Sequence, residues 1–189
     1  MENVEFYIVN QELWYRQIDG TTRRLTAHDI DIVQQLYDDF CTYYPEATSA
    51  LSKLYAKSKP LLPLYRYKIV NRFCRCNFGA IDNILDIDQF GRYHFEFVQC
   101  PLRGECPLEN IVCNPQFNSR LRPSELRVFK LLVDGLEKNA IADTLCLSIA
   151  TVNNHINNVY QRLGIHSLAE FLRYAHKFNI FSSCTQNKI

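Results

Sequence analysis

The segment from Ser148 to Leu163 constrains the fold of this chain more than any other stretch of its sequence. At the helical period of 100° per residue, its side chains separate onto two opposite sides. One side is wholly apolar and consists of Ile149, Val152, Ile156, Val159, Tyr160 and Leu163. The other is small or carboxamide-bearing and consists of Ala150, Asn153, Asn154, Asn157, Asn158 and Gln161. The pattern predicts an amphipathic helix over 148–163 that packs on one side only.

The carboxamide side differs from an ordinary solvated helix surface. Such surfaces normally mix Glu and Lys, which favour helix more than Asn does, and this side has neither. A carboxamide offers a donor and an acceptor side by side, which suits adenine N6 and N7 in the major groove of DNA. From the residues alone, this face is either a base-contacting surface, through Asn153, Asn154 and Asn157, or a polar helix surface without a partner.

Shorter helical patterns flank this segment. Residues 125–134 are apolar at helical spacing and are followed by Gly135, which suits the left-handed position after a helix. Residues 139–145 predict a second short helix, and Ser148 is placed to cap the helix that follows. Residues 167–178 predict a last helix. Two helices joined by a short turn, the second with outward polar side chains, are typical of a helix-turn-helix.

The same stretch resembles the LuxR-type (GerE-like) DNA-binding domain. That family opens on Leu-Thr-x-x-Glu, continues with Ile-Ala-x-x-Leu, and begins its recognition helix with Ser-x-x-Thr-Val-x-x-His. The matching residues here are Leu121, Glu125, Ile141, Ala142, Leu145, Ser148, Thr151, Val152 and His155. The resemblance covers about a third of the chain. It implies a four-helix domain that binds double-stranded DNA with the helix 148–163 in the major groove.

The sequence also departs from the family pattern. Arg122 replaces the usual capping Thr, and Asn153 and Asn157 stand where family members commonly have Lys or Arg. We therefore expect phosphate contacts mainly away from the reading face. The candidates are Arg122, Lys138, Thr151, His155 and Arg162. For His155 a packing role is an open alternative.

The resemblance further implies a homodimer on DNA, because the last helix of this family often supplies the dimer contact. The candidate contacts are Phe171, Leu172 and Ala175. The same helix can also close the small core of the domain. RNA polymerase is an open further partner.

Charge and aromatic content divide the chain into two parts. Residues 1–116 have a net charge of −3 and residues 117–189 a net charge of +4, and 18 of the 24 aromatic residues lie at or before Phe117. This asymmetry indicates two different cores and a polyanion as the partner of the second part. We expect an α+β N-terminal sensor or assembly domain over 1–115, followed by an all-α four-helix domain over 116–189.

The first part predicts strands, helices and one long loop. Residues 4–17 mix aromatic and β-branched residues before the turn signal Asp19-Gly20, which is typical of a hairpin. Thr26-Ala27-His28-Asp29 resembles a capping box at a helix start. Further expected elements are a helix from Pro45, a helix over 64–73, a strand through Tyr93, Phe95 and Phe97, and a loop over 100–115.

Five of the eight cysteines lie within 40 residues of one another. Cys76, Cys100, Cys106 and Cys113 complete a four-thiolate set, with Cys74 as the competitor of Cys76. The spacing is wider than in a usual zinc knuckle, and the pairs Cys100-Pro101 and Cys106-Pro107 are also seen with iron–sulfur clusters. We expect a zinc ion here, with an iron–sulfur cluster or no metal as the alternatives.

Several classes of protein do not fit this sequence. It has no apolar run long enough to cross a bilayer, and its first residues are acidic where a signal peptide is basic, so we expect no membrane association and a cytoplasmic location. Asp38-Asp39 lies in a helical pattern and not after a strand, which argues against a receiver domain. No catalytic constellation or phosphate-binding loop stands out, so we expect no enzyme.

The sequence therefore favours a sequence-specific DNA-binding transcriptional regulator. Two alternatives stay open. The tail could act like a sigma-factor region 4, although the first part lacks a basic helical region. It could also be a protein-interaction module that no longer binds DNA, because the reading face has no Lys or Arg.

Overall fold

The computed structural model describes residues 1–79, 81–82, 84–178 and 180–181. The chain divides into two compact units, Met1–Asn118 and Ser119–Ile189. The sequence placed the boundary between residues 115 and 116. Among the described residues, no helix is both long and apolar enough to cross a membrane.

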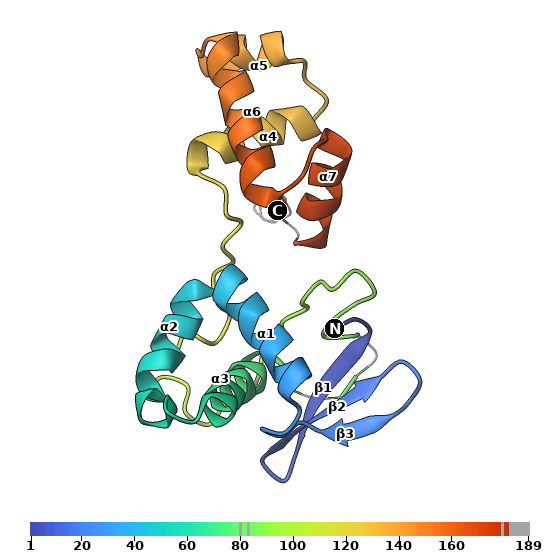
Figure 1. The fold of residues 1–189 in the computed structure, drawn as a ribbon, viewed down its shortest axis with the longest axis vertical. Helices are drawn as coiled ribbons and strands as arrows, with labels where there is room; N and C mark the ends of the chain where they lie inside the picture. Colours follow the sequence, from blue (N-terminus) through green and yellow to red (C-terminus); the bar gives the residue numbers. More distant parts are fainter. Residues whose placement is uncertain (80, 83, 179, 182–189) are drawn as a thin grey trace. The chain divides into compact units, whose positions relative to one another are not determined.

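The N-terminal unit opens with a small antiparallel sheet in the order β1-β2-β3 (Figure 1). Its strands are β1 (Val4–Val9), β2 (Glu12–Gln17) and β3 (Thr22–Arg24). The turn between β1 and β2 is formed by Asn10 and Gln11, both with positive φ, 50° and 66°. The expected turn at Asp19-Gly20 joins β2 to β3 instead.

Three α-helices and a short 3-10 helix follow the sheet. They are α1 (Ile30–Tyr43), α2 (Pro45–Leu54), η1 (Ala56–Ser58) and α3 (Leu62–Asn77). Helix α3 packs against α1, β1 and β2 (Figure 1). The Asp29 carboxylate accepts from the Thr26 N–H at 2.7 Å, as in a capping box. The expected helix start at Thr26 is wrong, however, because this bond closes a turn that precedes the helix, and α1 begins only at Ile30.

An aromatic core joins these elements. Phe40 of α1 stacks on Phe73 of α3 with ring centroids 3.9 Å apart, and Tyr44 and Phe95 pack beside them. The expected strand over 93–97 is wrong for the described residues, which form only a single bridge between Ile87 and Tyr93. The reason is that the backbone N–H groups of 94 and 96 donate to Asp86 and Asn77, which belong to no strand.

The C-terminal unit contains the four expected helices. They are α4 (Pro123–Val133), α5 (Lys138–Leu145), α6 (Ile149–Leu163) and α7 (Leu168–Lys177). Helices α4 and α5 both pack against α6 (Figure 1). The fully buried side chains of this core include Val128, Phe129, Ile141, Val152, Val159 and Phe171. An α+β unit followed by a four-helix unit confirms the predicted fold class.

Candidate nucleic-acid interface and cysteine cluster

A tight turn positions helix α6. Helix α5 ends at Cys146, which adopts the left-handed conformation with φ 53°, and the Leu147 N–H donates to the Ala142 carbonyl at 2.9 Å. Ser148 then caps α6, because its Oγ accepts from the Thr151 N–H at 3.1 Å. The helix ends at Gly164, also left-handed with φ 66°. The predicted cap and the predicted helix are both confirmed.

The two sides of α6 lie as the periodicity predicted, except that Ile149, the first residue of the helix, is 45% exposed. Val152, Ile156 and Val159 are buried in the core of the unit. On the opposite side, Asn154 and Asn157 are exposed and Asn153 is half-buried. Asn158 and Gln161 extend this exposed side.

The amide groups of Asn153, Asn154 and Asn157 make no hydrogen bond to other residues in the part of the chain that the structure describes. Their donors and acceptors are therefore available to an external partner. We call the side formed by Asn153, Asn154, Asn157, Asn158 and Gln161 the carboxamide face.

Arg162, which the sequence placed among the phosphate contacts, is hydrogen bonded to other residues of its own unit. Its Nη1 and Nη2 donate to both carboxylate oxygens of Glu125 at 2.6 and 2.9 Å, and Nη1 also donates to the Arg120 carbonyl at 3.0 Å. Glu125 is only 1% exposed. The hydrogen bonds from Arg162 lower the pKa of Glu125 below its usual range. This pair fastens the end of α6 to the start of α4, which gives Arg162 a structural role.

The other residues expected to contact phosphate differ in their exposure and in their hydrogen bonds. Arg122 and Lys138 are exposed, whereas His155 is half-buried. The Thr151 hydroxyl lies 2.8 Å from Ser148 Oγ. The Arg122 N–H donates to Glu125 at 2.8 Å, so Glu125 supplies the helix-start acceptor at α4, where the family's capping Thr is missing.

Helix α7 exposes only one of the three residues expected at a dimer contact. Phe171 is fully buried against Phe129, with ring centroids 4.0 Å apart, and Ala175 is also buried. Leu172 is 41% exposed. The expected contacts at Phe171 and Ala175 are wrong, because both side chains close the core of their own unit.

In the N-terminal unit, Asn77 joins the end of α3 to the cysteine-rich loop. Its Nδ2 donates to the Val112 carbonyl at 2.8 Å, and its Oδ1 accepts from the Asn114 N–H at 2.9 Å. These bonds bracket Cys113 in the loop and lie next to Cys76 in the helix. Cys113 accordingly lies close enough to Cys76 to contribute to the raised pKa of the Cys76 thiol.

The other two expected thiols lie in the same region. Cys100 is near enough to Cys76 for their charges to interact, and the Arg72 guanidinium, one turn before Cys76, lies near both Cys76 and Cys106. Cys74 instead is fully buried in the core of the unit. We call Cys76, Cys100, Cys106 and Cys113 the cysteine cluster.

The four thiols of the cysteine cluster are spread apart. Within the described residues, no three of its thiols have all their Sγ atoms within 4.8 Å of one another. Burial, the largest effect, raises the pKa of the Cys76 thiol to about 12.

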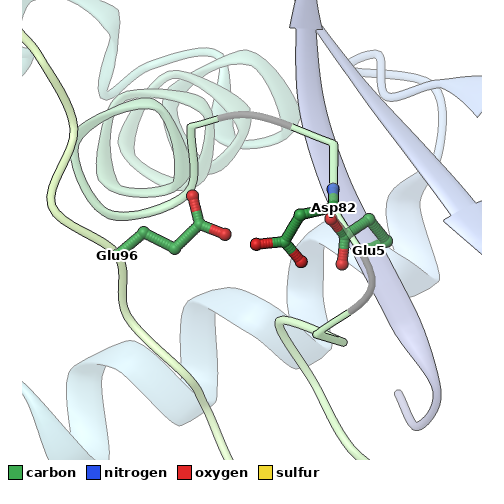
Figure 2. Close-up of side chains that lie close together, drawn as sticks. All are labelled: Glu5, Asp82 and Glu96. Carbon is green, nitrogen blue, oxygen red and sulfur yellow. Dashed lines mark hydrogen bonds between the residues drawn. The ribbon is translucent and has the colours of Figure 1, made fainter.

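A second cluster, of carboxylates, was not predicted. Oxygens of Glu5 in β1, Asp82 and Glu96 lie within 4.8 Å of one another, and Figure 2 shows the three side chains gathered beside β1. Glu5 is fully buried, and its Oε1 accepts from the Asp82 N–H at 2.9 Å. Burial raises the pKa of Glu5, and the neighbouring acids add to this shift. The three positions are far apart in the sequence, so no local spacing signals them.

Asp86 lies close to the carboxylate cluster, and the negative charges of Glu5, Asp82 and Glu96 act on it. Its Oδ2 accepts from the Phe6 N–H at 2.6 Å, whereas Oδ1 is buried without a hydrogen-bond partner among the described residues. Burial, reinforced by Glu5 and Glu96, raises the pKa of Asp86 to about 8. Asp86 is therefore protonated at neutral pH.

The tight turn between α5 and α6, together with the outward polar side of α6, defines a helix-turn-helix domain. Comparison with known protein families identifies which kind of helix-turn-helix domain this is. Residues 119–175 match the model of the family described as bacterial regulatory proteins, luxR family. The C-terminal unit thus carries a LuxR-family helix-turn-helix domain, as its motifs predicted.

Curated relatives match part of the chain. The Fimbriae Z protein of Escherichia coli (strain K12) is 41% identical over 56 residues, which are 30% of this chain and 27% of that protein. The HTH-type transcriptional regulator MalT of Yersinia pestis (strain Pestoides F) is 28% identical over 97 residues, 49% of this chain and 10% of that protein. The chain thus matches about a quarter of the length of the Fimbriae Z protein and about a tenth of the length of MalT. No solved structure matches the chain significantly.

Proposed function

We propose that this protein is a sequence-specific DNA-binding transcriptional regulator that reads the major groove with α6. The carboxamide face is the observation that carries the proposal. It lies on the second helix of a LuxR-family helix-turn-helix, opposite the buried Val152, Ile156 and Val159. A bidentate carboxamide contact to adenine N6 and N7 gives about 1–3 kcal/mol of discrimination against another base. Asn153, Asn154 and Asn157 are the proposed base-contacting residues.

Phosphate contacts from outside this face would supply the remaining affinity. The exposed Arg122 and Lys138 are the proposed main contacts, with Thr151 and His155 beside them. Arg162 contributes indirectly by holding the end of α6 through Glu125. This division separates positioning on the duplex from reading of the bases.

The proposal is tested by selecting duplexes from a random library with the full chain. We expect one sequence motif to be enriched, and binding to the selected duplex to weaken steeply as salt rises, since phosphate contacts release counterions. A protein-interaction module that no longer binds DNA would enrich no motif and retain no duplex, which would contradict the proposal.

We further propose that two copies bind a pseudo-palindromic site, with Leu172 of α7 in the contact between them. The exposed apolar side chain of Leu172 supports this proposal. Leu172→Glu is expected to abolish the two-chain complex on a selected duplex, because a charge would be buried in the contact. A footprint of one half-site at saturating wild-type protein would contradict the dimer.

A further inference from the structure

We propose that Cys76, Cys100, Cys106 and Cys113 bind a thiophilic metal centre, either a zinc ion or an iron–sulfur cluster. This site lies in the N-terminal unit and goes beyond the proposed DNA binding. Thiolates are the ligands that zinc and iron–sulfur clusters select. The structure supports the proposal through the way it brings residues separated by up to 37 positions in the sequence to one place.

The loop is fastened to α3 at the site itself. Asn77 bonds the backbone on both sides of Cys113, at Val112 and Asn114, and places this thiol against Cys76. Asn77 is itself fully buried. A buried side chain that uses both its amide nitrogen and its oxygen on the loop fixes one edge of the site, since each bond is shielded from water.

Arg72 supplies positive charge to the same place. Its side chain lies one turn before Cys76 on α3, near enough to Cys76 and Cys106 to interact with both. Its buried Nε has no hydrogen-bond partner within the described residues. A four-thiolate centre carries a net negative charge, and N–H groups directed at its sulfurs stabilise such centres. Arg72 is suited to this role by both charge and position.

The loop makes few apolar contacts with the core of its unit. Residues 100–113 form turns without a helix or a strand, and Leu108 and Val112 are its apolar contacts with the core. Ordering the backbone costs about 1–2 kcal/mol per residue. Metal binding offsets that cost, because the free energy of ligation becomes free energy of folding.

Metal binding is expected to tighten the loop. The edge of a zinc–thiolate tetrahedron is about 3.8 Å, since each Zn–S bond is about 2.3 Å. Among the described residues, no three thiols of the cysteine cluster have all their Sγ atoms within 4.8 Å of one another. The sulfur atoms are therefore farther apart than those of zinc-bound thiolates. Ligation of zinc would draw them together, whereas an iron–sulfur cluster accepts a wider spread, since its thiolates bind different irons.

The test is the metal content and loop protection of the full chain, purified without chelator and without oxygen. We expect either about one equivalent of zinc, or iron with matching acid-labile sulfide and a visible absorption band. Limited proteolysis should leave the segment 100–116 intact, and removal of the metal should open it to cleavage. Both forms of the centre support the proposal, and the elemental ratio distinguishes them.

Substitutions separate ligation from folding. Cys106→Ser and Cys100→Ser should each lose the metal and expose the loop, whereas Cys41→Ser, in α1, and Cys146→Ser, in the C-terminal unit, should retain it. Fluorescence of Trp14 in β2, the single tryptophan, reports whether the N-terminal unit stays folded.

The proposal is overturned if the wild-type chain holds neither metal and if added zinc fails to protect the four thiols from a thiol reagent. Because this readout does not involve DNA, its failure leaves the proposed DNA binding standing.

Discussion

Helix α6 and the loop 100–113 carry the two candidate sites, and different forces hold their side chains in place. In α6 the backbone hydrogen bonds of one helix set the spacing, and Val152, Ile156 and Val159 fix which side is buried. In the loop, contacts between residues far apart in the sequence set the positions, above all those made by Asn77. A site on a helix is therefore formed before its partner arrives, whereas the cysteine cluster would take its final geometry only with the metal that we propose.

The largest expected effect tests how α6 is held. Arg162→Ala should lower the free energy of unfolding of the C-terminal unit by about 3 kcal/mol, because Glu125 is left buried without its ion-pair partner. Urea unfolding of the full chain, followed by far-UV circular dichroism, measures this loss. Trp14 fluorescence should show the N-terminal unit unchanged.

Arg127→Ala is the control for that experiment. Arg127 is exposed on α4, and its removal should change stability by less than about 0.5 kcal/mol. If Arg162→Ala proves as stable as this control but weakens binding to every duplex equally, Arg162 contacts phosphate and is not the residue that holds α6.

A smaller effect is expected in the N-terminal unit, whose free energy of unfolding should depend on pH. Asp86 has a pKa of about 8 in the folded chain, against 3.8 ordinarily, so the folded state holds a proton that the unfolded state has lost. Stability must then fall as pH rises between these values and level off above about 8. Between pH 6 and 8 the expected loss is about 2 kcal/mol, since one pKa unit corresponds to about 1.4 kcal/mol.

Asp86→Asn should remove much of that dependence, because the amide oxygen can still accept from the Phe6 N–H and carries no charge. The groups that interact with Asp86 are Glu5, Asp82, Glu96 and Cys74. Asp31→Asn, at an exposed position of α1, is the control and should keep the wild-type slope. Unfolding midpoints from Trp14 fluorescence at pH 6 and pH 8 decide the matter, and an equal slope in Asp86→Asn and wild type would rule out Asp86 as its origin.

The C-terminal unit could be predicted closely from its sequence because its structure is locally encoded. Helical spacing, the Ser148 cap and the glycine after Leu163 give α6 to within a residue. The ion pair of Glu125 with Arg162 was missed, since the two residues lie 37 positions apart and Arg162 looks like any other basic residue near DNA.

The N-terminal unit could be predicted only in part. Helices α1 to α3 follow from apolar spacing and proline positions. The β1–β2 turn was missed because Asn10 and Gln11 take up left-handed conformations for which glycine is the usual signal. The carboxylate cluster joins Glu5, Asp82 and Glu96, and no local pattern reports a grouping that depends on the folded chain.

The most direct test of the central claim is the effect of Asn154→Ala on binding to the selected duplex and to a scrambled one of equal length. Asn154 is exposed on the carboxamide face, so we expect a loss of about 1–3 kcal/mol on the selected duplex and almost none on the scrambled one. Asn158→Ala, at the edge of the same face, should leave both affinities within about twofold of wild type. An equal loss on both duplexes, or no loss on either, would show that Asn154 does not read bases and would contradict the account.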